Sequence, residues 1–230
     1  MRNPFPRPLI LGHRGAPREA PENTLASFAR AMEAGADGVE LDVQRSRDGV
    51  PVVIHDDTLE RTMGVRGAVS ALDWPAIGQL TQARVPSLEQ AAAWAAAAGA
   101  WLNVEVKSAG VEAATLRVIE GVGLSGRTLF SSFQPAVVAE LGRLAPGALR
   151  FLLLEAWDDA AYDAVLGCGA AGVCLEAAAA DALTLEVLRN EDLPVVVWTV
   201  DDPTRIRSLF RQGVAAVITN DPRGAVVETG

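Results

Sequence analysis

Short apolar runs rich in β-branched residues recur along the chain, and each is followed by turn residues and then by an alanine-rich stretch with helical spacing. This alternation of a strand period with a helix period predicts repeated βα units. The expected strands are Pro8–Leu11, Gly38–Val43, Trp101–Val106, Thr128–Ser131, Arg150–Leu154, Gly172–Leu175, Pro194–Trp198 and Ala215–Ile218. The expected helices are Glu22–Ala34, Leu88–Ala98, Val111–Val122, Pro135–Leu144, Ala160–Leu166, Ala182–Arg189 and Pro203–Arg211.

Eight strands that alternate with helices within 230 residues favour an α/β fold of the (β/α)₈ TIM-barrel type over an open sheet. One segment interrupts the alternation after the second strand. There, Ser46–Gly49 predicts a turn and Pro51–Ile54 is apolar again, so we expect a hairpin followed by a loop-like insertion that ends at Pro86. No linker or shift in composition divides the chain, and residues 1–230 are predicted to form a single domain.

Composition and charge exclude several classes of protein and of binding partner. Hydrophobic residues make up 50% of the chain and charged residues 21%, which excludes a disordered or coiled-coil protein. A formal net charge of -9 repels polyanions, so we expect neither nucleic acid nor an anionic membrane surface as a partner. The proline-broken N-terminus gives no signal-peptide core and the longest apolar stretch, Gln90–Val104, is too short to span a bilayer. The expected location is cytoplasmic, and the oligomeric state stays open.

Acidic residues interrupt two of the predicted strands near their carboxyl ends. Glu40 and Asp42 are two positions apart and therefore point to one face, and Glu105 and Lys107 repeat this spacing on the next barrel strand. One such carboxylate alone could point outward and pair with an arginine. Three that converge repel one another unless they share a cation, and an all-oxygen ligand set suits Mg²⁺ or Ca²⁺. The pattern predicts one divalent cation held by these three carboxylates.

The basic residues add candidates for proton transfer and charge stabilisation. The chain has two histidines, His13 and His55, and both flank the carboxylates in the sequence, where they could supply an acid and a base. Lys107 is the only lysine among twenty basic residues. A compact ammonium fits a narrow site where a planar guanidinium does not, so we expect Lys107 to contact a phosphate oxygen or a carboxylate.

Several motifs together resemble those of the glycerophosphodiester phosphodiesterases. They are His13-Arg14-Gly15, Pro21-Glu22-Asn23-Thr24, Gly38–Val43 continuing through Asp48-Gly49, His55-Asp56-Asp57, Leu59-Glu60-Arg61-Thr62 and Asn103-Val104-Glu105-Val106-Lys107. Weaker resemblance continues through Ser131-Ser132-Phe133, Val197-Trp198-Thr199-Val200 and Ile218–Pro222, so it covers nearly the whole chain. Departures are few: Ser46 and Met63 differ from the usual residues, and Thr58–Pro86 is a compact version of the family's insertion.

The resemblance implies a metal-dependent (β/α)₈ barrel of glycerol and lipid metabolism that hydrolyses glycerophosphodiesters to glycerol 3-phosphate and an alcohol. By this resemblance the metal ligands would be Glu40, Asp42 and Glu105, and the acid/base pair would be His13 and His55. Arg14 and Lys107 would contact the phosphate, while Phe133 and Trp198 would line the glycerol side of the pocket. The substrate would be a small molecule.

Two alternatives stay open at this point. A related barrel could act on lysophospholipids, or a barrel of this fold could bind phosphate without catalysis. The sequence also leaves open the alcohol headgroup, the choice between Mg²⁺ and Ca²⁺, and which histidine is the acid. The nucleophile could be water or the substrate's own hydroxyl, which would pass through a cyclic phosphate.

Overall fold

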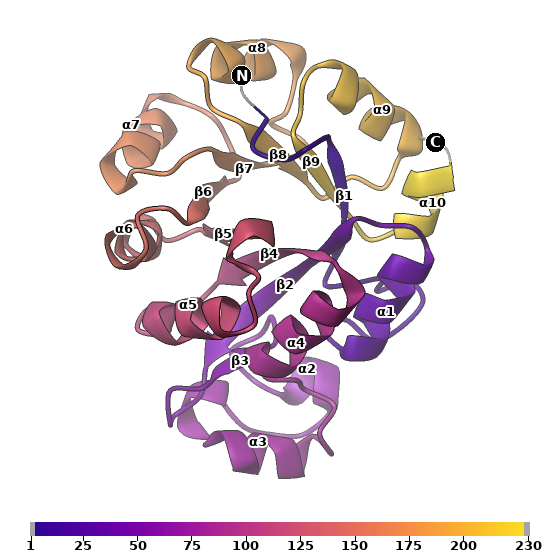
Figure 1. Ribbon diagram of the computed structural model, residues 1–230, viewed down its shortest axis with the longest axis vertical. Helices are drawn as coiled ribbons and strands as arrows, with labels where there is room; N and C mark the ends of the chain where they lie inside the picture. Colours follow the sequence, from indigo (N-terminus) through magenta and orange to yellow (C-terminus); the bar gives the residue numbers. More distant parts are fainter. Residues whose placement is uncertain (1–2, 228–230) are drawn as a thin grey trace.

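Eight parallel strands close into a barrel surrounded by helices in a computed structural model that describes residues 3–227 (Figure 1). Closure occurs where β1 pairs with both β2 and β9, which confirms the predicted TIM barrel. The barrel strands are β1 (Leu9–His13), β2 (Gly38–Arg45), β4 (Trp101–Val106), β5 (Thr128–Ser132), β6 (Leu149–Leu154), β7 (Val173–Glu176), β8 (Val195–Trp198) and β9 (Ala216–Thr219). Each contains or overlaps one of the predicted strands.

The outer helices also follow the predicted order. They are α1 (Leu25–Glu33), α4 (Leu88–Ala98), α5 (Glu112–Gly121), α6 (Pro135–Leu144), α7 (Asp159–Cys168), α8 (Ala182–Asn190) and α9 (Pro203–Arg211). Helix α1 begins three residues later than predicted because the Thr24 hydroxyl caps it by accepting a hydrogen bond from the Ser27 amide. Helix α4 begins at a capping box between Ser87 and Gln90 and ends at Gly99 in the left-handed conformation.

The segment after β2 forms the expected hairpin. Strand β3 (Pro51–Val53) pairs with β2 in antiparallel fashion, with Val53 opposite Val43. The segment that follows is more ordered than the predicted loop, because it holds α2 (Glu60–Met63), a 3₁₀ turn (Val69–Ala71) and α3 (Trp74–Leu80). Helices of four and seven residues are too short to show a helical period in the sequence. The same reason explains why α10 (Pro222–Val227) and a second 3₁₀ turn (Ser125–Arg127) were not predicted.

Alternation along the strands separates an outer apolar layer from the barrel interior. Val39, Leu41 and Val43 are fully buried among residues of the outer helices, so the residues between them, Glu40 and Asp42, face the interior. Elsewhere the interior is apolar, as at Leu11, Leu129, Phe151, Cys174, Val196 and Ile218. Phe5, upstream of β1, packs edge-to-face on Trp101 at the start of β4. The amino end of the barrel is thus filled by apolar groups, and polar interior groups lie toward the carboxyl end.

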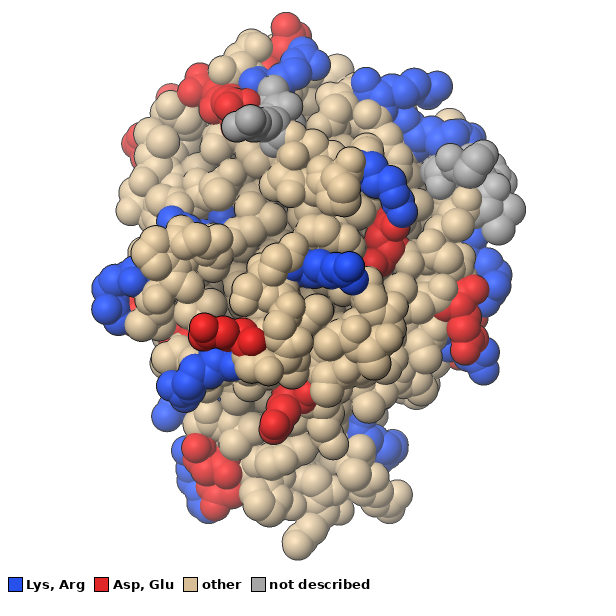
Figure 2. Space-filling model, viewed as in Figure 1, with Lys and Arg blue, Asp and Glu red and all other residues tan. Residues whose placement is uncertain are grey.

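Charged side chains on the face shown in Figure 2 are dispersed, and basic groups often adjoin acidic ones. No helix within residues 3–227 is long and apolar enough to cross a membrane. Both cysteines, Cys168 and Cys174, are buried and free.

Candidate active site

A tight turn at the end of β1 presents the first two predicted site residues. The Gly15 amide donates to the Gly12 carbonyl at 3.1 Å, and Arg14 between them has a φ of 53°. A side chain on Gly12 would come within 2.2 Å of the Gly15 carbonyl oxygen, and one on Gly15 within 2.4 Å of Ser27 Oγ. Glycine is therefore required at both positions for the turn to close and for His13 and Arg14 to face the pocket.

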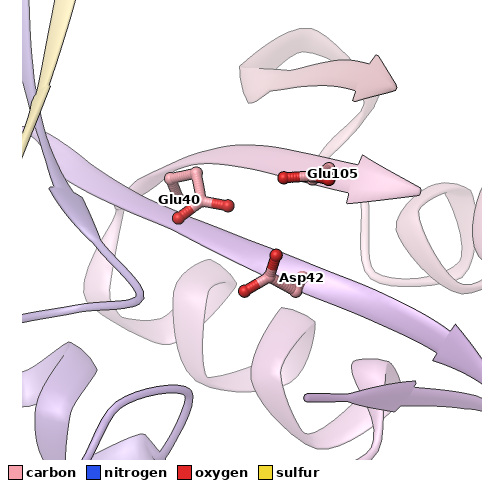
Figure 3. Close-up of side chains that lie close together, drawn as sticks. All are labelled: Glu40, Asp42 and Glu105. Carbon is pink, nitrogen blue, oxygen red and sulfur yellow. The ribbon is translucent and has the colours of Figure 1, made fainter. Parts of the chain in front are cut away.

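The three predicted ligand carboxylates converge. Glu40 and Asp42 project from β2 and Glu105 from the neighbouring β4, with their carboxylates turned toward one another (Figure 3). One oxygen from each residue lies within 4.8 Å of the others. Two oxygens on opposite sides of a cation at about 2.4 Å would be about 4.8 Å apart, so this spacing fits a single bound Ca²⁺ or, with a slight contraction, Mg²⁺.

The electrostatics of this cluster also fit a cation. Burial, together with the charges of Asp42 and Glu105, raises the pKa of Glu40 well above its usual range. Burial and Asp42 likewise raise the pKa of Glu105. Among the described residues, the buried Asp42 Oδ1 has no hydrogen-bond partner. Two carboxyl groups that resist ionisation, beside a third with a buried oxygen that accepts no hydrogen bond, are the donor set that a hard divalent cation would complete.

Two cations of the protein border the triad. Lys107 Nζ lies 2.9 Å from Glu105 Oε1 and 3.5 Å from Asp42 Oδ1. Burial opposes the charge on Lys107, but these two carboxylates outweigh it and raise its pKa. Arg14 Nε lies 3.2 Å from Asp42 Oδ2, and the Arg14 backbone amide donates to Glu40 Oε2 at 3.0 Å. Both cations therefore lie where they could meet an anionic ligand of a cation held by the triad.

The two histidines are held by different kinds of acceptor. His13 Nδ1 is 2.7 Å from the amide oxygen of Asn220, and its Nε2 is 4.0 Å from Glu40 Oε2. Burial, then the charge of Arg14, lowers the pKa of His13. His55 Nδ1 is 2.7 Å from a carboxylate oxygen of Asp56. In each ring Nδ1 has a hydrogen-bond partner within the protein, so Nε2 is the nitrogen available to a ligand.

These residues surround one pocket at the carboxyl end of the barrel. Every predicted site residue lines it except Asp42, which is 1% exposed and accepts a hydrogen bond from Asn23 at 2.8 Å. Phe133 and Trp198 form an edge-to-face pair on one wall, with ring centres 5.6 Å apart. Leu153 on β6 and Ile218 on β9 also line the pocket, whereas the carboxylates project from β2 and β4. The pocket therefore has an apolar side and an acidic side that come from different strands.

Several residues of the site carried no predicted role. Asn103 and Ser131 line the pocket and are hydrogen-bonded to each other at 2.8 Å. Asn23 fixes Asp42, and Asn220 fixes His13. Asn23, Asn103 and Asn220 fall within motifs that resemble those of the family, so the sequence did indicate that these positions belong to the site. Residue type and spacing alone did not show which neighbour each amide would contact.

Comparison with known proteins agrees with this geometry. Residues 13–223 match the model of the Glycerophosphoryl diester phosphodiesterase family. A glycerophosphodiester phosphodiesterase of Caldanaerobacter subterraneus is 30% identical, with 93% of this chain and 94% of that protein covered. The structure of an Oleispira antarctica phosphodiesterase in complex with the product sn-glycerol-3-phosphate has a TM-score of 0.87 at 28% identity, covering 96% of each chain. A glycerophosphodiester phosphodiesterase from Thermotoga maritima has a TM-score of 0.82 at 28% identity, covering 97% of this chain and 99% of that one. On sequence and fold, this chain belongs to the glycerophosphoryl diester phosphodiesterase family.

Proposed function

We propose that the protein hydrolyses glycerophosphodiesters to glycerol 3-phosphate and an alcohol with the help of one divalent cation, Mg²⁺ or Ca²⁺. One observation carries the proposal: the carboxylates of Glu40, Asp42 and Glu105 converge beside a pocket that is lined by Glu40, Glu105 and both histidines of the chain. The bound cation would supply positive charge to a phosphate oxygen. Relatives named for this activity and a neighbour with bound glycerol 3-phosphate support the substrate class.

Arg14 and Lys107 would share the stabilisation of charge on phosphorus. Attack on a phosphodiester adds negative charge to the oxygens around phosphorus, and fixed cations at that position lower the barrier. Both residues line the pocket beside the triad, and Arg14 is also anchored to Glu22 by an ion pair at 3.0 Å. An anchored guanidinium loses little freedom when it meets the substrate, which favours binding in a fixed orientation.

The acceptors of the two rings support a division of their roles. His13 faces a neutral amide through Nδ1–H, so its Nε2 carries a lone pair and can take the proton of the nucleophile. His55 Nδ1 contacts the Asp56 carboxylate, which orients the ring and leaves Nε2 for the substrate. His55 would then give its proton to the alkoxide as the bond from phosphorus to the alcohol oxygen breaks. His13 is the base and His55 the acid in this proposal.

The apolar wall of the pocket gives the substrate its direction. Phe133 and Trp198, with Leu153 and Ile218, would cover the carbon skeleton of glycerol, while the phosphate faces the carboxylate side. The leaving alcohol would lie toward the open mouth of the pocket, where Phe133 is 43% exposed. A small polar alcohol needs no further enclosure in this arrangement.

An assay of glycerol 3-phosphate release from glycerophosphocholine tests the proposal. Release is measured before metal removal, after metal removal with EDTA, and after addition of Mg²⁺ or Ca²⁺. We expect turnover that is lost with EDTA and restored by one or both cations. Lysophosphatidylcholine serves as the competing substrate, and faster turnover of it would favour the lysophospholipid alternative. Binding of glycerol 3-phosphate without any turnover would favour the phosphate-binding alternative.

A further inference from the structure

A carboxylate outside the pocket contacts the amide that holds His13. Asp201 lies in the loop after β8, and Asn220 directly follows β9. Asp201 Oδ2 accepts a hydrogen bond from Asn220 Nδ2 at 3.2 Å, and Asp201 Oδ1 accepts one from the Asn220 backbone amide at 2.7 Å. Asn220 therefore lies between Asp201 on one side and His13 on the other.

The orientation of the Asn220 amide follows from this contact. An ionised carboxylate only accepts hydrogen bonds, so the side of Asn220 that faces Asp201 must be its NH₂ group. The carbonyl oxygen then faces His13 Nδ1, which must carry a proton to form the 2.7 Å contact. A neutral imidazole has one N–H, so Nε2 is left with the lone pair.

Asp201 is itself held as an acceptor. Its Oδ1 also accepts from the Thr219 hydroxyl at 3.0 Å, and its Oδ2 from Arg18 Nη2 at 2.7 Å. Burial opposes ionisation of Asp201, but hydrogen bonds from the backbone and side chain of Asn220 outweigh it and lower its pKa. Arg18 belongs to the loop that follows His13 and also pairs with Asp221 at 2.7 Å. The loops after β1, β8 and β9 are thus joined at this carboxylate.

We propose that Asp201 is a positioning residue that fixes the His13 tautomer by orienting the Asn220 amide. The inference deepens the proposed function and rests on it for the role of His13 Nε2 in proton transfer. Asp201 does not line the pocket, and it acts on the His13 ring through Asn220.

The variant Asp201→Asn should reverse the direction of the hydrogen bonds that link residue 201, Asn220 and His13. Its new amide oxygen must remain at the Asn220 backbone N–H, because that main-chain donor cannot move away. Its NH₂ group then faces the NH₂ of Asn220, and the Asn220 side chain relieves this clash by rotating its amide. Asn220 would present a donor to His13, whose proton would move from Nδ1 to Nε2.

A double variant restores the original pattern. In Asp201→Asn combined with Asn220→Asp, the carboxylate at position 220 accepts hydrogen bonds from the new amide and from His13 Nδ1–H. Total charge is unchanged relative to the parent protein. Asp202→Asn is the matched control, because Asp202 is the next residue and caps α9 through the Thr204 amide, a role that asparagine also performs.

The tautomer can be read directly from ¹⁵N spectra of histidine-labelled protein. The chain has only two histidines, and a His55→Gln variant assigns them. The spectra are recorded at about pH 8, above the ordinary imidazole pKa of ~6.5, where the His13 ring, whose pKa is lowered by burial, is neutral. We expect protonated Nδ1 in the parent, the Asp202→Asn control and the double variant, and protonated Nε2 in Asp201→Asn. A wild-type tautomer in Asp201→Asn would overturn the inference.

Kinetics and binding separate this inference from the proposed function. A wrong tautomer removes the base, so kcat for Asp201→Asn should fall roughly 100-fold or more, with cation affinity unchanged and with activity largely restored in the double variant. A switched tautomer with full activity would support the positioning role and overturn the role of His13 as base. If Asp201→Asn does not fold, Asp201→Ala replaces it, because it also removes the acceptor that orients the Asn220 amide: loss of the fixed Nδ1-protonated tautomer of His13 supports the inference, and the parent tautomer overturns it.

Discussion

Arg61 donates two hydrogen bonds to the Asp56 carboxylate, from Nε to Oδ2 at 2.6 Å and from Nη2 to Oδ1 at 2.9 Å. The hydrogen bonds from Arg61 lower the pKa of Asp56 to about 2, so Asp56 stays ionised beside His55 across the neutral range. Arg61 also pairs with Glu22, which pairs with Arg14. Because Arg61 lies on α2, the insertion is linked to both the proposed acid and a phosphate contact.

Arg61→Met should therefore reduce kcat by about tenfold, less than the roughly hundredfold expected for loss of an acid or base. The Asp56 carboxylate would lose its fixed position, and His55 would lose its orientation. The melting temperature should change little, because Arg61 is half exposed and surface ion pairs contribute about 0–1 kcal/mol. Arg66→Met, an exposed arginine of the same insertion, is the control. Wild-type kinetics for Arg61→Met would contradict this role.

Glu105→Ala should abolish cation binding in isothermal titration calorimetry and, with it, turnover of glycerophosphocholine. The triad would keep two carboxylates, and the ammonium of Lys107 would neutralise part of their remaining charge. Glu89→Ala on the exposed side of α4 should bind the cation like the parent. Cation affinity that survives Glu105→Ala unchanged would remove Glu105 from the ligand set.

Cation affinity should weaken as the pH falls. Burial and mutual repulsion raise the pKa values of Glu40 and Glu105, so both carboxyls hold their protons at a higher pH than ordinary glutamates. A raised pKa means that protons compete with the cation over a wider acidic range, and that binding releases protons. Calorimetry in two buffers with different ionisation enthalpies measures this release. A dissociation constant that stays the same from about pH 8 to about pH 5, without proton release, would rule it out.

His55→Ala should leave cation and glycerol 3-phosphate binding intact and lower kcat by roughly a hundredfold or more, the usual scale for losing an acid or base. The ring contacts Asp56 and no ligand carboxylate in the described hydrogen bonds, so its removal leaves the triad in place. Binding is measured by calorimetry and kcat by product release. A variant as fast as the parent would reject the role of His55 in proton transfer.

Lys107→Arg should fold normally but turn over at least about tenfold more slowly, a loss on the order of 1 to 3 kcal/mol of charge stabilisation. The planar head of arginine cannot occupy the point between Glu105 and Asp42 where the ammonium lies. Lys107→Ala should be slower still. If Lys107 is only a structural partner of Glu105, arginine will substitute well, and alanine will disturb cation affinity and melting temperature more than kcat.

The sequence alone determined the barrel and the centre of its site. Strand and helix periods are local properties, so the eight strands and the outer helices could be placed from the spacing of apolar residues. The two-residue spacing of Glu40 and Asp42 within an apolar strand was enough to predict that both point to one face, because alternation is fixed by the backbone. Convergence with Glu105 then followed from the pairing of neighbouring parallel strands.

Only the tertiary structure decided how the histidines are held. The contact between His13 and Asn220 joins the two ends of the chain and exists because β1 pairs with β9 when the barrel closes. Asp201 reaches Asn220 because neighbouring parallel strands bring their following loops to one face. Local periodicity carries no information about which loop side chains meet there. The orientation of an amide, and with it the position of a proton, was set by contacts between segments that lie far apart in the sequence.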